Sequence, residues 1–254
     1  MADAAVEQAA RPHPTISVVT VVYNGAAHIA RTIDSILSQD HPAIEVVVVD
    51  GASGDGTQAI VEHYGDAVDV FASEPDRGIY DAMNKGVALA SGEFLLFMNC
   101  GDTFAGTGAL SAAAKELVAD TEQVLFACWE RDEGAGCRVR RRASLERGLF
   151  NHQSVLYSRS LHRRFGGYVS VRGFTTADYL FFMTLVDSGS VPCRCTDLAL
   201  AVIDVGGVSA GSQTLSQKVA IDFLLGRASR GRLMMVLAGH PTYRRAKALL
   251  RRLR

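Results

Sequence analysis

Three aspartates occupy positions where a carboxylate could take part in chemistry, namely Asp50, Asp102 and Asp178. Asp50 ends the apolar run 45–50 (EVVVVD), where its carboxylate could accept a hydrogen bond from the ring N–H of a nucleobase. The alternative is a cap for the glycine-rich loop that follows, because Asp side chains bond readily to nearby backbone amides. Both roles are open from the residues alone.

Asp102 follows the apolar segment 93–98 and three small residues, Asn99, Cys100 and Gly101. Small neighbours let a diphosphate and a divalent ion approach the carboxylate closely. Mg²⁺ typically takes one or two carboxylates, and phosphate oxygens and water complete its shell. Such an ion would neutralise the charge on a leaving diphosphate. The alternative role is that of a turn-forming aspartate.

Asp178 lies in the segment 175–178 (TTAD), at the predicted start of a helix. The spacing is that of a capping box, with Thr175 as the N-cap and Asp178 three residues later. A carboxylate in a first helical turn can also face a cleft and act as a general base, so the two roles are compatible. His152, in the segment 151–154 (NHQS), could bind a metal or a phosphate, although a single histidine is more often simply hydrogen-bonded.

Other motifs indicate no competing chemistry. GxxxxGK[ST] and GxGxxG are absent, which argues against P-loop hydrolases and nicotinamide dehydrogenases. The segment 207–211 (GVSAG) fits a nucleophile elbow, and Asp222 and His240 follow it in the expected order. Too few residues remain there for the strands of a hydrolase, so a glycine-rich turn is the better interpretation. Cys193 and Cys195 are too close together and too isolated for a zinc site.

Strand and helix patterns alternate along the first part of the chain. Continuous apolar runs predict buried strands, and apolar spacing of the helical type predicts helices between them. The strands are expected at 15–22, 45–50, 68–72 and 93–98, and the helices at 26–38, after Thr57, and at 78–90, with Ile79 on the inward face of the last. This alternation predicts an α/β fold with a doubly wound, mostly parallel sheet and helices on both faces.

Polar residues gather at the ends of the four predicted strands. In a doubly wound sheet, ligands bind beyond the carboxyl ends of the strands, so these side chains are expected to converge on one crevice. They are Tyr23 and Asn24 after the first strand, Asp50 after the second, Asp76 and Arg77 after the third, and Asp102 after the fourth.

The second half of the chain has a less regular pattern. Strands are predicted at 124–129, 155–157 and 198–205, a helix at 177–187, and a hairpin strand or loop at the basic segment 138–142. We expect one domain at 15–225, with a nucleotide-binding half (15–110) and an acceptor half (111–225) on the same sheet. A disordered tail at 1–14 is expected to precede it, and a basic amphipathic tail at 226–254 to follow it.

The composition is that of a folded, water-soluble protein. Hydrophobic residues make up 48% and charged residues 21% of the 254 residues, and the mean hydropathy is +0.12. These values exclude a disordered chain, and no period typical of collagen or of a coiled coil is present. No apolar run is long enough to span a membrane, and 1–14 lacks the pattern of a secretory signal. Five cysteines without framework spacing favour a reduced, cytoplasmic protein.

Positive charge is concentrated at the C-terminal end. Nine of the 26 Lys and Arg residues lie in 227–254, and no acid follows Asp222. Leucines alternate with these arginines in an amphipathic way, which favours an anionic membrane surface over nucleic acid as the partner of Arg227–Arg254. A solvated last helix is the equally weighted alternative.

Six stretches of the sequence together resemble family 2 glycosyltransferases with the GT-A fold. They lie between residue 15 and about residue 210, and 73–86 is long enough to be specific by itself. That segment resembles the branch of the family that builds bacterial polysaccharides and glycolipids. The stretches are 18–25 (VVTVVYNG), 47–57 (VVVDGASGDGT), 73–86 (SEPDRGIYDAMNKG), 92–102 (GEFLLFMNCGD), 151–154 (NHQS) and 177–179 (ADY).

The resemblance implies transfer of a sugar from a nucleotide-diphosphate donor to a hydroxyl group, with inversion at the anomeric carbon. It implies that Asp102 binds Mn²⁺ or Mg²⁺, that His152 could help bind the metal, and that Asp178 deprotonates the acceptor. The residues that would bind the nucleotide sugar are Thr20, Tyr23, Asn24, Asp50, Asp76, Arg77, Asn99 and Gly101.

The sequence departs from the family pattern at two places. Asp102 is the one sure carboxylate of the DxD motif, since Cys100 or Asn99 stands at the first position, and this could weaken metal binding. Gly51 replaces an acid that many members carry after the second strand, which could change how the base or ribose is held.

The leading hypothesis is therefore an inverting, metal-dependent glycosyltransferase of the cytoplasm, docked on the inner face of the membrane. Its donor would be UDP-, GDP- or dTDP-linked, its acceptor a hydroxyl on a saccharide, glycolipid or other lipid-linked molecule, and no nucleic acid partner is expected. A catalytically silent nucleotide-sugar binding protein is one alternative, suggested by the reduced DxD motif. A nucleotidyltransferase is another, and it would release pyrophosphate from a nucleoside triphosphate.

Overall fold

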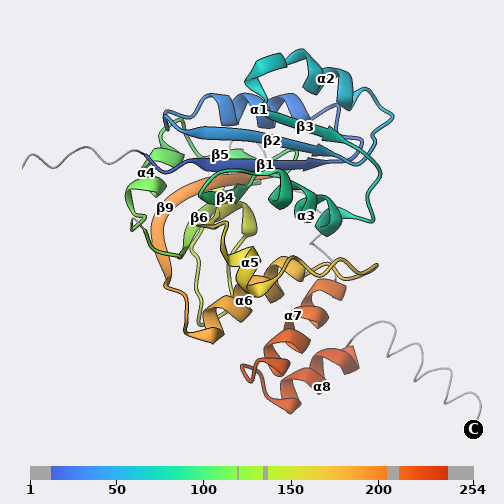
Figure 1. Ribbon diagram of the computed structural model, residues 1–254. Coiled ribbons are helices and arrows are strands. Elements are labelled where there is room, and N and C mark those ends of the chain that lie inside the picture. The colour runs from blue at the N-terminus through green and yellow to red at the C-terminus, as the bar shows by residue number, and fades with distance from the viewer. Residues whose placement is uncertain (1–12, 119, 134–136, 205–211, 240–254) are drawn as a thin grey trace, which may run out of the picture.

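The computed structural model describes residues 13–118, 120–133, 137–204 and 212–239. One curved sheet runs through the molecule, with helices on both of its faces (Figure 1), as predicted. The strands are β1 (Ile16–Val22), β2 (Ile44–Asp50), β3 (Val70–Ser73), β4 (Phe94–Phe97), β5 (Thr103–Phe104), β6 (Val124–Asp132), β7 (Arg138–Arg141), β8 (Val155–Ser158) and β9 (Cys193–Ile203). The helices are α1 (Ile29–Leu37), α2 (Thr57–His63), α3 (Ile79–Leu89), α4 (Ala109–Lys115), α5 (Leu161–Phe165), α6 (Ala177–Ser188), α7 (Ser212–Leu224) and α8 (Arg230–Gly239), with the 3₁₀ turns η1 (Gly65–Ala67) and η2 (His152–Ser154).

The two halves of the sheet pair differently. The strand order is β3-β2-β1-β4-β8-β6-β9-β5, and β7 pairs with β6 outside this path. The pairs β1–β2, β1–β4 and β2–β3 are parallel, as predicted for the first half. In the second half, β8 is antiparallel to both β4 and β6, β9 is parallel to β6, and β5 is antiparallel to β9. The expectation of a mostly parallel sheet therefore holds for the first half, and the second half is mixed.

The inner strands are buried on both faces, which explains their continuous apolar sequences. Val19 and Val47 join a core that includes residues of α3 and α6. Their neighbours Val18 and Val46 join a second core that includes residues of α1. Helix α3 lies very close to β1 at Gly86, where a methyl group would lie 2.4 Å from a Val19 side-chain carbon. Glycine is thus required at the closest approach of helix and sheet.

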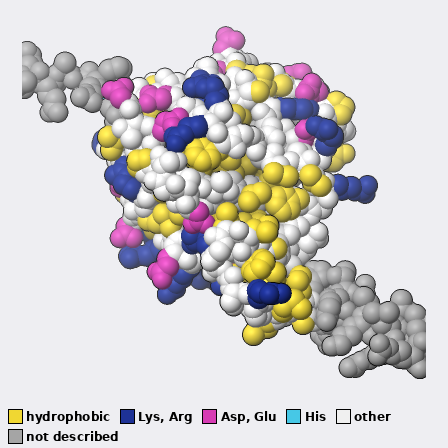
Figure 2. Space-filling model, turned by 60° about the horizontal axis from the view of Figure 1, so that its bottom comes forward, with side chains coloured by type: hydrophobic (Ala, Val, Ile, Leu, Met, Phe, Trp, Pro, Cys, Tyr) yellow, Lys and Arg dark blue, Asp and Glu magenta, His cyan; other side chains and the backbone are white. Residues whose placement is uncertain are grey.

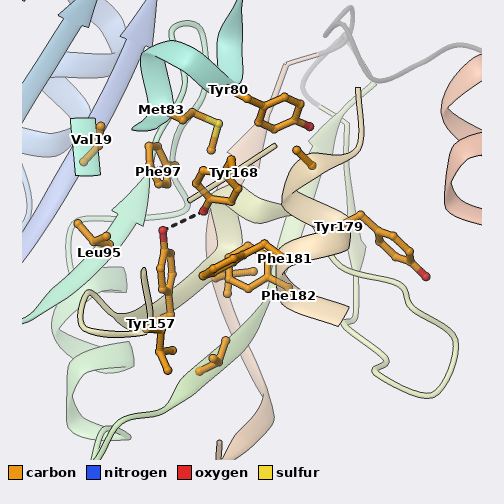
Figure 3. Packing of buried hydrophobic residues seen from close by; sticks show 14 of the residues in the cluster. Val19, Tyr80, Met83, Leu95, Phe97, Tyr157, Tyr168, Tyr179, Phe181 and Phe182 are labelled. Carbon is orange, nitrogen blue, oxygen red and sulfur yellow. Dashed lines mark hydrogen bonds between the residues drawn. The ribbon is translucent and has the colours of Figure 1, made fainter. Parts of the chain in front are cut away.

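An aromatic cluster fills the space between the sheet and α6 (Figure 3). Phe181 and Phe182 project from α6 onto Tyr157 of β8, with ring centroids 6.1 and 5.1 Å from that ring. The hydroxyl groups of Tyr157 and Tyr168 are 2.9 Å apart and form a hydrogen bond inside this cluster. The Tyr179 ring stacks on Phe150, with centroids 5.6 Å apart, and its hydroxyl donates to Asp222 of α7 at 2.7 Å. The first turn of α6 is therefore fixed from two sides.

Three strands differ from their predicted bounds by more than one residue, and one of them, β6, runs to Asp132 instead of 129. β3 begins at Val70 instead of 68, because the Val68 amide bonds to the Gly65 carbonyl at 3.2 Å and closes the turn η1. β9 begins at Cys193 instead of 198 and ends at Ile203 instead of 205. Its first residues include exposed polar side chains such as Arg194, so no apolar run marks them. They become a strand through pairing with β6.

The orientation of α3 also differs from the prediction. Ile79 was expected to face inward, but its side chain is exposed, and the next residue, Tyr80, is buried instead. The reason is a polar contact of Tyr80 with α6, because its hydroxyl donates to Asp178 at 2.6 Å. Apolar spacing alone favours isoleucine for the inward position, so this contact was not foreseen.

The C-terminal part comprises two helices that lie below α6 (Figure 1). Gln217 of α7 accepts a hydrogen bond from the Thr175 amide at 2.9 Å, and its Nε2 donates to the Gly173 carbonyl at 2.7 Å. Helix α7 thus holds the loop that leads into α6. The predicted tails fall mostly at 1–12 and 240–254, outside the described residues. None of the described helices is long and apolar enough to cross a membrane.

Candidate functional site

Asp50, the last residue of β2, holds the loop that follows this strand. This side chain is fully buried, and it accepts hydrogen bonds from the Ser53 amide at 2.9 Å, the Ser73 hydroxyl at 2.7 Å and the Ser53 hydroxyl. Of the two predicted roles, the structure therefore shows the cap. Asp50 shapes the loop from beneath and has no surface left to contact a nucleobase directly.

Asn24 ties the loop after β1 to the loop after β2. Its backbone adopts φ 50°, in the left-handed region that Asn tolerates. Its side-chain oxygen accepts from the Gly54 amide at 3.0 Å, and its own amide donates to the Ser53 hydroxyl at 2.7 Å. A second tie joins the same loops, because the Gly25 amide donates to the Thr57 hydroxyl at 2.9 Å. The Thr57 hydroxyl accepts this bond between the loops and does not cap α2, whose N-cap residue is Gly56.

Tyr23 and Asp76 lie beside these loops, next to the buried Gly51. The Tyr23 side chain is 68% exposed. A methyl group on Gly51 would lie 2.5 Å from Asp76 Oδ2 and 3.3 Å from a Tyr23 ring carbon, so ring and carboxylate flank the glycine. Asp76 is oriented by the Gly78 amide, which donates to its Oδ1 at 2.8 Å. The neighbouring Arg77 pairs with Asp81 at 3.1 Å and remains mostly exposed.

Thr20 lies in the middle of β1 and is fully buried. Its hydroxyl has no hydrogen-bond partner among the described residues. The structure thus places Thr20 inside the sheet, without access to the crevice at the strand ends.

Asp102 lies almost fully buried after β4. Its Oδ1 accepts from the Asp204 amide at 3.0 Å, and its Oδ2 accepts from Gln153 Nε2 at 2.6 Å. Burial raises the pKa of this carboxyl above its usual value, and the two hydrogen bonds offset that only in part. The preceding Gly101 has φ +100°, a backbone conformation that favours glycine, and this turn presents the carboxylate.

The surroundings of Asp102 fit a hard divalent cation. Two buried amide oxygens of the crevice, Asn99 Oδ1 and Gln153 Oε1, lack hydrogen-bond partners in the described part of the chain. Together with the Asp102 carboxylate they form an oxygen-donor set of the kind that Mg²⁺ prefers and that suits Mn²⁺. No group of three or more His, Cys, Asp or Glu side chains among the described residues could hold a metal. One carboxylate with amide and phosphate oxygens is therefore the arrangement this site allows.

Asp178 lies in the first turn of α6, with its side chain 17% exposed. Its Oδ1 accepts from the Tyr80 hydroxyl at 2.6 Å, and its Oδ2 is 3.0 Å from His152 Nδ1. Burial alone would raise the pKa of Asp178. The hydrogen bonds from His152 and Tyr80 outweigh it, so the pKa is lowered.

The predicted capping box at α6 is wrong. The N-cap residue is Thr176, and it makes no side-chain capping bond. Thr175 is engaged by Gln217 and Thr214 of α7. Asp178 cannot reach back toward a capping position because both of its oxygens are taken by residues across the crevice.

The two acids lie in one site, joined by His152 and Gln153. His152 contacts Asp178 on one side and Asn99 on the other, and Gln153 contacts Asp102. The turn after β4, one of the four strand ends expected at the crevice, is thus linked to the start of α6. Sequence analysis missed Gln153 as well as the contact of Tyr80, although both residues lie inside the segments 151–154 and 73–86 that carry the family resemblance.

Comparisons with known proteins agree with this geometry. Residues 17–184, more than half of the chain, match the model of the family described as "Glycosyl transferase family 2". An uncharacterised glycosyltransferase of Mycobacterium tuberculosis is 30% identical over 206 residues, which cover 78% of each chain. A PGL/p-HBAD biosynthesis glycosyltransferase of the same species is 28% identical over 204 residues, covering 77% of this chain and 79% of the relative.

Solved structures show the same fold. The mannosyltransferase PcManGT from Pyrobaculum calidifontis, in complex with GDP-Man and Mn²⁺, superposes with a TM-score of 0.69 at 23% identity, covering 89% of this chain and 69% of that chain. TarS from S. aureus, in complex with UDP-GlcNAc, gives a TM-score of 0.67 at 20% identity, covering 89% and 71%. The GT-A fold expected from the resemblance is therefore confirmed. With its site geometry, its matched region and its mycobacterial relatives in agreement, the chain belongs to glycosyltransferase family 2.

Proposed function

We propose that this protein is an inverting, metal-dependent glycosyltransferase that moves a sugar from a nucleotide diphosphate to a hydroxyl group. One observation carries the proposal: a carboxylate held by two hydrogen bonds, Asp178, shares a crevice with a buried carboxylate suited to a cation, Asp102. The first supplies a base for the acceptor, and the second supplies a place for the leaving diphosphate and its metal.

The donor is proposed to lie across the ends of β1, β2 and β4. Tyr23 offers an exposed ring for the nucleobase, and Asp76 and Arg77 offer charged groups beside it. Asn99 and Gly101 lie where the diphosphate would approach Asp102. The buried Thr20 and Asp50 would support this surface from within, and the exposed Asn24 would tie its two loops together. The complexes of PcManGT with GDP-Man and of TarS with UDP-GlcNAc support a nucleotide-sugar donor.

Asp178 is the proposed base. Its lowered pKa keeps the carboxylate ionised at neutral pH, so a lone pair is available to take the acceptor proton. Positioned general bases typically contribute about 10²–10⁴-fold to a rate. As the proton moves to Asp178, the acceptor oxygen attacks the anomeric carbon from the side opposite the diphosphate, which inverts that centre.

Negative charge develops on the diphosphate during this step. A divalent cation held by Asp102, Asn99 and Gln153 would supply electrostatic stabilisation of the leaving group. The protein itself shields the carboxylate from water, because Asp102 is only 6% exposed. His152 is not included among the proposed ligands, since both of its ring nitrogens already face protein atoms at 3.0 Å.

We also propose that the protein is cytoplasmic and that α8 docks it on an anionic membrane surface, close to a saccharide or lipid-linked acceptor. Figure 2 shows hydrophobic side chains beside basic ones at the end of the molecule where α7 and α8 lie. Met234 and Met235 are 60% and 75% exposed, and the neighbouring Arg230 and Arg232 are exposed as well. Exposed apolar and basic residues on one helix favour an anionic bilayer. Arg227 is excluded from this surface because it pairs with Asp187 at 2.6 Å.

Co-sedimentation with phosphatidylglycerol vesicles tests the docking. We expect the double variant Met234→Glu, Met235→Glu to lose vesicle binding, because it removes apolar area and adds negative charge. The variant Leu215→Glu, at an exposed position of α7, is the matched control and should bind like the wild type. Equal binding by the double variant and the wild type would remove the membrane surface from the proposal.

A donor screen tests the transfer reaction. UDP-, GDP- and dTDP-linked sugars are each added with and without Mn²⁺, and the melting temperature is followed. We expect one nucleotide class to raise it, and to do so more strongly with Mn²⁺. With that donor and an acceptor panel, NMR of the product should show the anomeric configuration opposite to that of the donor. Binding without turnover would favour the silent binding protein, and release of pyrophosphate from a nucleoside triphosphate would favour the nucleotidyltransferase.

A further inference from the structure

Two consecutive side chains reach the two acids of the crevice. His152 Nδ1 lies 3.0 Å from Asp178 Oδ2, and Gln153 Nε2 donates to Asp102 Oδ2 at 2.6 Å. His152 also faces Asn99, with 3.0 Å between its Nε2 and the Asn99 side-chain nitrogen. The dipeptide 152–153 therefore connects the start of α6 with the turn after β4, two segments far apart in the sequence.

The backbone of this dipeptide is rigidly anchored. It forms the turn η2, which Asn151 caps by accepting from the Gln153 amide at 3.2 Å through its side chain and from the Ser154 amide at 2.9 Å through its carbonyl. Strand β8 follows directly, fully buried between β4 and β6. The side chains of His152 and Gln153 extend from this fixed backbone, so they can hold the groups they contact in defined positions.

The surroundings of His152 define what each ring nitrogen does. A carboxylate accepts hydrogen bonds, so the nitrogen that faces Asp178 must carry a hydrogen and donate it. The other nitrogen faces the amide of Asn99, whose own side-chain oxygen is buried without a partner in the described part of the chain. The His152 side chain is 11% exposed, and both of its ring nitrogens contact protein atoms.

A base with one hydrogen bond can still turn about its carbon–carbon bond. Tyr80 holds Asp178 at Oδ1, and His152 holds it at Oδ2, so the two donors together fix the plane of the carboxylate. The acceptor proton must meet a lone pair that points in one direction. Misplacement of a reacting group by about 1 Å can cost about 10²-fold in rate.

We propose that His152 is a positioning residue, which orients the proposed base Asp178 through Nδ1 and links that orientation to the donor-side residue Asn99 through Nε2. This inference rests on the proposed glycosyl transfer. Gln153 does the corresponding task on the other side, where it holds the Asp102 carboxylate. Loss of His152 should then slow the transfer step and leave donor binding intact, whereas a metal ligand at this position would show the opposite pattern.

Three substitutions separate the two ring nitrogens. The side-chain nitrogen of Asn falls near the position of His Nδ1. The terminal amide of Gln falls near the position of His Nε2, where its oxygen can accept from the Asn99 side-chain nitrogen. His152→Ala removes both contacts, His152→Asn restores the donor to Asp178, and His152→Gln restores the contact toward Asn99. The exposed His63 on α2 provides the matched control, His63→Ala.

Steady-state kinetics with the donor and acceptor that the screen selects give the readout. We expect His152→Ala to lower kcat by about 10²-fold, with the donor KM and the calorimetric donor Kd within about twofold of the wild type. His152→Asn should recover at least about tenfold of the lost kcat, corresponding to ~1.4 kcal/mol. His152→Gln should stay near the Ala value, and His63→Ala should match the wild type.

Two results would overturn the inference. One is equal kcat for the Ala and Asn variants, and the other is a rise in donor KM that disappears at high Mn²⁺, which would make His152 a metal ligand. If His152→Ala lowers the melting temperature, the comparison is made between His152→Asn and His152→Gln, which both keep a polar group at this position. Failure of the proposed function is distinct, since the wild type itself would then transfer no sugar.

Discussion

The two sides of the crevice hold their carboxylates in different ways. On the donor side, Asp102 accepts two hydrogen bonds from uncharged amide groups, and its pKa is raised by burial. On the acceptor side, Asp178 accepts from Tyr80 and His152, and its pKa is lowered in spite of burial. The protein therefore stabilises the charge of Asp178 by itself, whereas the charge of Asp102 lacks such compensation. A cation would supply it, so in the proposed reaction the donor side would be completed by its ligand, whereas Asp178 is already held by the protein.

The largest expected effect separates these two environments. Asp102→Asn should lower transfer by about 10²–10³-fold, because a group that stabilises the developing charge is lost. The further rise in melting temperature that Mn²⁺ causes in the donor complex should be lost as well. The free energy of unfolding should be unchanged or higher at neutral pH, since a buried charge is removed. Retention of the Mn²⁺ effect in this variant would show that Asp102 does not hold the cation.

A second prediction concerns the aromatic cluster beneath Asp178. His162 stacks on Phe181 with centroids 4.5 Å apart, and burial lowers its pKa to about 4. The pKa of this histidine in the unfolded chain is about 6.5, so the unfolded chain takes up a proton at a higher pH than the folded chain does. The contribution of neutral His162 to the free energy of unfolding is therefore complete above pH 6.5 and is lost as the pH falls toward 4. Between pH 7 and pH 5 the loss is about 2 kcal/mol.

Urea denaturation at both pH values measures this loss, and the variant His162→Asn serves as the reference for all other titrating groups. The wild type should lose about 2 kcal/mol more than the variant between pH 7 and pH 5. An equal loss in both proteins would mean that His162 is protonated as easily in the folded chain as in the unfolded one.

The smallest effect tests the donor-side surface. Gly51→Ala places a methyl group 2.5 Å from Asp76 Oδ2, so the carboxylate must move away from Tyr23. Overpacking of this kind costs ~1–3 kcal/mol, and we expect the donor KM to rise about tenfold with kcat little changed. Gly54→Ala in the same loop meets no atom within 4 Å and is the matched control. Equal donor KM values for both variants would place the nucleoside elsewhere.

The strands of the first half were predictable because their signal is local. β1 and β2 are continuous runs of apolar, mainly β-branched residues, and their polar ends follow directly in the sequence. The start of β9 carries no such signal, since exposed and partly exposed polar side chains at Arg194 and Thr196 interrupt the apolar pattern. Its pairing with β6 decides the structure there.

The candidate site shows the same limit. Asp102 and Asp178 stand out in the sequence, but their partners do not, because Tyr80 lies 98 residues from Asp178 and Gln153 lies 51 residues from Asp102. Asp50 had two open roles, and its bond to Ser73, 23 residues away, shows that it supports the loop. Long-range hydrogen bonds assign such roles, and neither spacing nor composition records them.

The central claim is that Asp178 receives the acceptor proton while the donor is bound on the opposite side of the crevice. Asp178→Asn keeps the shape of the side chain and removes the base, so transfer and donor binding can be measured on the same protein. We expect kcat to fall by about 10²–10⁴-fold, with the donor Kd from calorimetry in the presence of Mn²⁺ unchanged. Transfer at the wild-type rate by Asp178→Asn would contradict the account.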